Sequence, residues 1–201
     1  MNGHPFTIHL LEPPLHEFVP HDSEKLHQLS KELGISMRLL KRRVLALHEN
    51  NPMLGHRGVR LGISYPEITE MQVKAIFEGT AELIKKGKKA LPEIMIPVTC
   101  TGNELIHQKK MVEKVYKEVC EKMKLQKIPY LYGTMIEIPR AALKAAEMAT
   151  VADFFSFGTN DLTQMCFGFS RDDIGGFLPI YLDQNLLKDG RFKTIDKEGG
   201  G

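Results

Sequence analysis

The sequence predicts an α/β protein built on a parallel sheet, and two observations carry this prediction. From Tyr65 onward, patterns typical of helices and strands alternate, which indicates parallel strands joined by helical crossovers. Residues 130–165 show a strand, a helix and a strand in direct succession. Parallel strands end at the same edge of a sheet, and α/β proteins build their sites at that edge.

The N-terminal third predicts one strand followed by two helices. The apolar run at residues 6–11 is typical of a strand. Asp22 or Ser23 can cap the first helix, and Ser36 can cap the second. Residues 51–63 predict a loop-like passage around a short strand, because three glycines interrupt them.

The rest of the chain predicts three helices that alternate with three strands. The expected elements are a helix from Pro66, a strand at 93–98, a helix capped by Asn103, a strand at 130–138, a helix at 140–149 with Pro139 in its first turn, and a strand at 153–157. Beyond Met165 the pattern weakens, and we expect a loop at 167–178 and a short helix at 180–187.

Composition excludes several classes of function. The chain is 42% hydrophobic and 26% charged, which is typical of a soluble globular protein. A net charge of +2 indicates neither a nucleic-acid nor a membrane partner, and no apolar stretch is long enough to span a bilayer. The odd set Cys100, Cys120 and Cys166 lacks metal-ligand spacing, which favours a reduced compartment, the cytosol or an organelle matrix.

Two carboxylates stand just past the ends of neighbouring predicted strands. Glu137 follows the strand at 130–138, and Asp161 follows the strand at 153–157. Magnesium prefers a few carboxylates together with waters and substrate oxygens, so the pair could hold this ion. The alternative is that both are solvated residues of the sheet edge.

Further candidates point to a small anionic ligand. Arg57, between glycines, could form a fork with a carboxylate or phosphate, or it could make a structural ion pair. Gly158 and Thr159 could offer backbone N–H groups to an anion, and Asn160 could bind a carbonyl oxygen. Three others are weaker: we interpret His16 and His56 as structural or exposed and Cys166 as packed.

Four motifs resemble one family closely. At NPMLGHRGVRL, PEIMIPV, GTMIEIPRAAL and FFSFGTNDLTQM the chain resembles the pyruvate, phosphate dikinases, and the resemblance extends over nearly its whole length. It implies a (βα)8 barrel, the phosphoenolpyruvate (PEP)/pyruvate-binding domain, of which residues 1–201 would form a part without the first and last strands. The implied reaction interconverts ATP, phosphate and pyruvate with AMP, diphosphate and PEP, through a phosphohistidine on another domain.

The resemblance implies a role for each candidate residue. Glu137 and Asp161 correspond to the Mg²⁺ ligands, and Arg57 corresponds to a substrate-binding arginine that can neutralise the transferring phosphoryl group. The substrate-binding loop corresponds to Gly158, Thr159, Asn160 and Asp161, and Glu137 also lies against the substrate.

The chain departs from the family pattern at two places. His9 stands where the family has a substrate-binding arginine, and Glu12 replaces an aspartate. Histidine cannot make the bidentate fork of an arginine, so we expect weaker phosphate binding at this position. The family's catalytic cysteine lies in a glycine-rich motif on the last barrel strand, and no cysteine of this chain stands in such a motif.

The sequence leaves three interpretations of function open. The chain could be a segment of a dikinase, inactive alone for lack of the catalytic cysteine and the phosphohistidine domain. It could instead be a non-catalytic module that binds Mg²⁺ and pyruvate, or an inactive gene fragment. The family implies a homo-oligomer in the full-length enzyme and occurs in cytosol, plastids and glycosomes; enzyme I of the phosphotransferase system is a less similar rival.

Overall fold

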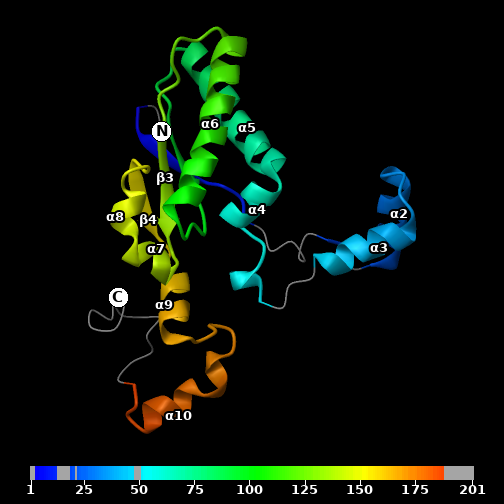
Figure 1. The fold of residues 1–201 in the computed structure, drawn as a ribbon, viewed down its shortest axis with the longest axis vertical. Helices are drawn as coiled ribbons and strands as arrows, with labels where there is room; N and C mark the ends of the chain where they lie inside the picture. The colour runs from blue at the N-terminus through cyan, green and yellow to red at the C-terminus, as the bar shows by residue number, and fades with distance from the viewer. Residues whose placement is uncertain (1–2, 13–18, 21, 48–50, 188–201) are drawn as a thin grey trace.

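The computed structural model describes residues 3–12, 19–20, 22–47 and 51–187, and it shows an α/β chain built on a four-stranded sheet (Figure 1). The strands, in spatial order, are β1 (Pro5–His9), β2 (Leu91–Ile96), β3 (Leu131–Ile136) and β4 (Phe154–Phe157). Every neighbouring pair is parallel. Sequential parallel strands of this kind form a curled half-barrel, which confirms the predicted partial (βα)8 fold.

Helices precede and follow the strands. They are α2 (Ser23–Glu32), α3 (Met37–Ala46), α4 (Val59–Ser64), α5 (Pro66–Lys85), α6 (Gly102–Met123), α7 (Pro139–Leu143), α8 (Ala145–Met148), α9 (Thr159–Phe167) and α10 (Leu178–Asp183), with 3₁₀ turns η1 (Pro52–Leu54) and η2 (Ile174–Gly176). The caps of α2 and α3 are confirmed: Asp22 accepts from the Glu24 N–H and Ser36 from the Leu39 N–H. No helix among the described residues is long and apolar enough to cross a bilayer.

The strand predicted within residues 51–63 is wrong, because this passage forms η1 and then α4. Gly58 has a φ of +58° and turns the chain, after which the Val59 N–H donates to the Pro97 carbonyl. A Cβ on Gly62 would lie 2.4 Å from Thr69 Oγ1, so the glycine lets α4 pack closely against α5. These contacts hold residues 59–64 as a helix instead of a strand.

Three further boundaries differ from the prediction. Thr101, not Asn103, caps α6, and it forms a capping box with Glu104. The helix predicted at 140–149 is divided at Lys144 into α7 and α8. The helix predicted at 180–187 is α10, which begins earlier and ends earlier. A capping contact sets the start of α6, whereas α7, α8 and α10 begin without a side-chain cap.

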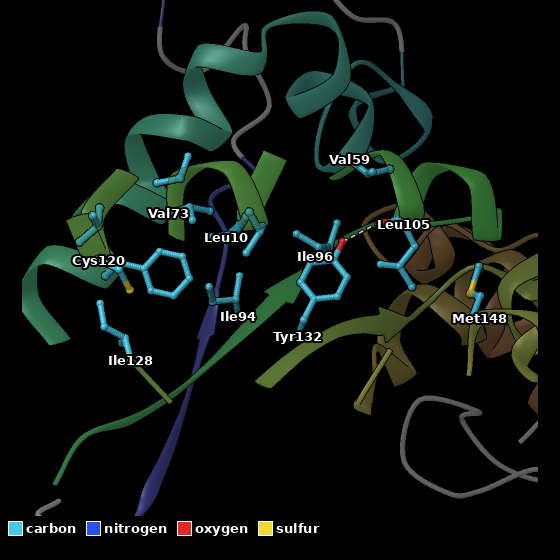
Figure 2. Packing of buried hydrophobic residues seen from close by; sticks show 14 of the residues in the cluster. Leu10, Val59, Val73, Ile94, Ile96, Leu105, Cys120, Ile128, Tyr132 and Met148 are labelled. Carbon is cyan, nitrogen blue, oxygen red and sulfur yellow. Dashed lines mark hydrogen bonds between the residues drawn. The ribbon is translucent and has the colours of Figure 1, made fainter. Parts of the chain in front are cut away.

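The core lies between the sheet and helices α5 and α6, which run side by side in Figure 1. Figure 2 shows Ile94, Ile96 and Tyr132 gathered beneath these helices. The Tyr132 hydroxyl donates to the Leu105 carbonyl over 2.8 Å, so the ring contributes both apolar area and a satisfied polar atom. This packing fixes β2 and β3, and with them the residues that follow each strand.

Helices α2 and α3 stand apart from the rest of the chain in Figure 1. They pack against each other through Leu26 and Leu40, the buried residues of this pair. None of the predicted site residues lies on either helix. The site is therefore carried by the half-barrel.

Candidate active site at the carboxyl ends of the strands

The fold brings the predicted site residues to one edge of the sheet. His9 is the last residue of β1, and Glu137 directly follows β3. Asp161 lies in the first turn of α9, which follows β4 after Gly158. Because all four strands are parallel, their carboxyl ends share this edge.

Glu137 is the buried centre of this edge. Glu137 is only 3% exposed, and its Oε1 accepts a hydrogen bond from the Val98 N–H. The pKa of Glu137 is raised to about 7, chiefly by burial and further by the charges of Glu12 and Asp161, while the Val98 hydrogen bond and Arg57 oppose this rise. The charges of two other carboxylates and one guanidinium therefore act on the Glu137 carboxylate.

The segment after β2 holds the donor that meets Glu137. Val98 has a φ of +60°, an uncommon left-handed conformation for a β-branched residue. Gly58 lies against it, since a Cβ there would be 2.7 Å from Val98 Cγ2. Thr134 Oγ1 lies 2.7 Å from the Ile96 carbonyl and 2.9 Å from Thr99 Oγ1, which ties β3 to the end of β2. These contacts orient the Val98 N–H toward the carboxylate and offset its backbone strain.

Arg57 forms an ion pair with Glu12, in which Nη2 lies 3.3 Å from Oε1. The same oxygen lies 3.6 Å from His9 Nε2. The ion pair left open as an alternative for Arg57 is thus present, while its effect on the Glu137 pKa places it at the candidate site as well. The sequence predicted no role for Glu12. Its position three residues after His9 could have indicated that it lies near the site.

Residues 158–161 form the start of α9 rather than a loop. The Gly158 N–H donates to the Ile136 carbonyl over 3.0 Å, and a Cβ on Gly158 would lie 2.8 Å from Glu137 Oε2. Only glycine lets the backbone approach the carboxylate so closely. Thr159 is the first helical residue, and Asn160 Oδ1 accepts from Arg171 Nη1 over 3.0 Å.

The weaker candidates lie elsewhere or remain untested. The His56 ring packs near the Tyr65 ring, with centroids 5.7 Å apart, and His16 lies outside the described residues. The prediction that Cys166 is packed is wrong, because this thiol is exposed. It lies two residues from the buried Gln164 on α9, which turns it to the opposite side of the helix.

The carboxylate oxygens at this edge suit a hard cation whose remaining coordination positions are filled by water or by substrate oxygens. Within the part of the chain that the structure describes, no cluster of three or more His, Cys, Asp and Glu side chains could enclose a metal ion. Magnesium is commonly held by one or two carboxylates plus substrate oxygens. A buried glutamate next to a second carboxylate, with glycine backbone beside it, is compatible with this mode of binding.

These features define a half-barrel α/β domain with a candidate cation and anion site at the carboxyl ends of its strands. The model of the PEP-utilising enzymes, PEP-binding domain, matches residues 1–183. The chain belongs to this family.

Several similar curated proteins are named pyruvate, phosphate dikinase. The chain is 53% identical to pyruvate, phosphate dikinase 1, chloroplastic, of Arabidopsis thaliana and 51% identical to pyruvate, phosphate dikinase of Rhizobium meliloti (strain 1021). All of this chain is covered, but only 21% and 22% of those two proteins. The chain thus spans about a fifth of the length of these curated relatives. Their names therefore describe proteins that are much longer than this chain.

Proposed function

We propose that the chain is the PEP/pyruvate-binding segment of a pyruvate, phosphate dikinase and serves Mg²⁺-dependent phosphoryl transfer between a phosphohistidine and pyruvate. The observation that carries this proposal is the buried carboxylate of Glu137, held at the strand edge among Asp161, Glu12 and Arg57. A carboxylate whose pKa is raised by burial and by neighbouring like charges is typical of a functional site. Family membership supplies the substrate class.

Glu137 and Asp161 are the residues that would hold Mg²⁺. When bound, the ion supplies positive charge where the enolate and carboxylate oxygens of pyruvate become negative. The Val98 N–H fixes one oxygen of Glu137, which leaves the other oxygen, beside Gly158, for the ligand side. The close approach of Gly158 also excludes side-chain bulk from the place where a small substrate would lie.

Arg57 and the start of α9 would recognise the anionic parts of the substrate. Arg57 carries the positive charge that can neutralise a transferring phosphoryl group. Thr159 and Asn160 belong to the first turn of α9, whose N–H groups have no partner within the helix and favour negative charge. The Arg171 contact holds the Asn160 side chain at this helix start.

The proposed role implies partners that the chain does not contain. The phosphohistidine domain of the full-length enzyme would deliver the phosphoryl group, and the full-length enzyme would form a homo-oligomer. The chain alone would bind ligand without completing the reaction. The relatives of Arabidopsis thaliana and Mesembryanthemum crystallinum are named chloroplastic, which favours an organelle matrix over the cytosol as the proposed compartment.

A thermal melt of the chain with Mg²⁺ and oxalate, an enolate mimic, tests the proposal. Because a ligand that binds only the folded state raises the midpoint, we expect a rise when both are present and none with either alone. Glu137→Gln should abolish the rise, whereas Glu118→Gln, an exposed residue of α6, should leave it unchanged. A cooperative melt that does not move with both ligands would overturn the proposal.

A further inference from the structure

We propose that Glu12 is a positioning residue that holds Arg57 and His9 as one unit facing the phosphoryl group of the substrate. This inference rests on the proposed function and extends it to a residue outside the predicted site. Glu12 follows β1 and reaches two side chains from different parts of the chain. Its role would be to orient cationic groups rather than to bind Mg²⁺.

The geometry makes Glu12 the shared acceptor of the pair. Its Oε1 lies 3.3 Å from Arg57 Nη2 and 3.6 Å from His9 Nε2. The side chains of Arg57 and Glu12 are only 20% and 21% exposed, so water screens the contact weakly. One carboxylate oxygen therefore contacts both side chains.

His9 is oriented from its other side as well. Its Nδ1 lies 2.7 Å from the Leu10 carbonyl, which can only accept, so Nδ1 carries the donated hydrogen. This contact directs Nε2 toward Glu12, and because Nδ1 already carries a hydrogen, Nε2 pairs with the carboxylate only when the ring holds a second hydrogen and is positively charged. The imidazole is thus held between a backbone carbonyl and the Glu12 carboxylate, and its orientation depends on both.

Arg57 requires such an anchor because of the loop that carries it. It stands between Gly55 and Gly58, and its own N–H donates to the Gly55 carbonyl in a tight turn. An arginine side chain has many rotamers, and ordering it when a ligand binds costs conformational entropy. A fixed partner reduces that cost, because it orders the side chain before the ligand binds. The Glu12 contact limits these rotamers before the substrate arrives.

The contact between Glu12 and Arg57 is one-sided on the part of the carboxylate. Glu12 Oε2 is buried and has no hydrogen-bond partner among the described residues, so the pair is not the two-point fork that arginine makes with a fully engaged carboxylate. A one-sided pair orients the guanidinium without matching its whole planar edge.

Calorimetric titration of the whole chain with Mg²⁺–oxalate and with Mg²⁺–PEP tests this role, because only PEP carries a phosphoryl group. With Glu12→Gln we expect the ratio of the dissociation constants, PEP over oxalate, to rise at least fivefold. Glu12→Asp keeps the charge but shortens the reach, so its ratio should rise less. Glu93→Gln removes a carboxylate of β2 that accepts from Thr7 and should leave the ratio unchanged.

The outcomes separate this inference from the proposed function. If Glu12 only neutralises charge, both ligands change affinity by the same factor in Glu12→Gln, and the positioning role is overturned. If the unmodified chain binds neither complex, the proposed function falls and this inference falls with it. A melt of each variant identifies those that fold, and Glu12→Asp provides the comparison if Glu12→Gln does not.

Discussion

Two regions of the same sheet differ in what holds them together. Beneath α5 and α6, strand residues such as Ile94 and Tyr132 are fully buried and packed (Figure 2), and Phe77 of α5 is fully buried as well. At the carboxyl edge the contacts are polar: a buried carboxylate, a left-handed Val98 and an ion pair. Apolar burial stabilises the fold, whereas the edge keeps charge and strain that cost stability. The difference supports the proposal that the edge is the functional part.

The largest effect should come from the packed region. Phe77→Ala removes a fully buried ring that contacts Tyr116 and Tyr130, and we expect a loss of about 3–5 kcal/mol in the free energy of unfolding. Denaturant titration would measure it. Leu143→Ala, at an 88% exposed leucine, should cost little by comparison. Equal losses at both positions would break the contrast between core and surface.

Gly158→Ala should damage the edge most directly. Its Cβ would lie 2.5 Å from Glu137 Cβ, so the backbone of α9 or the carboxylate must move, at a cost of roughly 1–3 kcal/mol. The Mg²⁺–oxalate rise in melting midpoint should disappear. Gly79→Ala in α5 has nothing within 4 Å of its Cβ and should instead stabilise by about 0.5–1 kcal/mol. A retained ligand response in Gly158→Ala would contradict the placement of the site.

The pKa of Glu137 predicts how stability depends on pH. Its folded-state pKa of about 7 exceeds the ordinary value of 4.5, so the native state binds the proton more tightly than the unfolded state. Without metal, this group makes stability fall as pH rises from about 4.5 to about 7, by roughly 1–3 kcal/mol. Thermal melts across this range would show the slope, and Glu137→Gln should flatten it.

Mg²⁺ should reverse this trend, because the ion binds the deprotonated carboxylate. The Mg²⁺–oxalate response should then be weak at pH 5 and complete above about pH 7. A response that is equal at both ends of the range would show that Glu137 is not a ligand of the ion. Asp161→Asn serves as the matched variant, since it tests the second carboxylate in the same assay.

The smallest effect concerns His9. His9→Arg restores a guanidinium at the end of β1, and one added charge-assisted hydrogen bond should improve PEP affinity by about 5- to 10-fold. Titration with Mg²⁺–PEP measures the gain. Oxalate affinity should change less, because oxalate lacks the phosphoryl group. No gain in PEP affinity would sink the idea that His9 weakens phosphate binding.

Much of the fold could be predicted because it is encoded over short distances in the chain. Alternating helix and strand patterns from Tyr65 onward predicted a parallel sheet, and the caps at Asp22 and Ser36 lie where their residue types indicated. Four residues of the candidate site, from Gly158 to Asp161, are continuous in sequence, and Glu137 directly follows a strand. Their position at the edge follows from strand direction alone.

The tertiary structure decided what depends on contacts between distant residues. The helix at Val59–Ser64 forms where the local pattern suggested a strand, because Gly62 packs against Thr69 and Val59 bonds to Pro97. The pairing of Glu12 with Arg57 joins two segments that no sequence periodicity relates. The sequence by itself determined the order of elements and the direction of the strands. Burial and charge around Glu137 depend on the folded neighbours, because desolvation and Coulomb interactions act through space rather than along the chain.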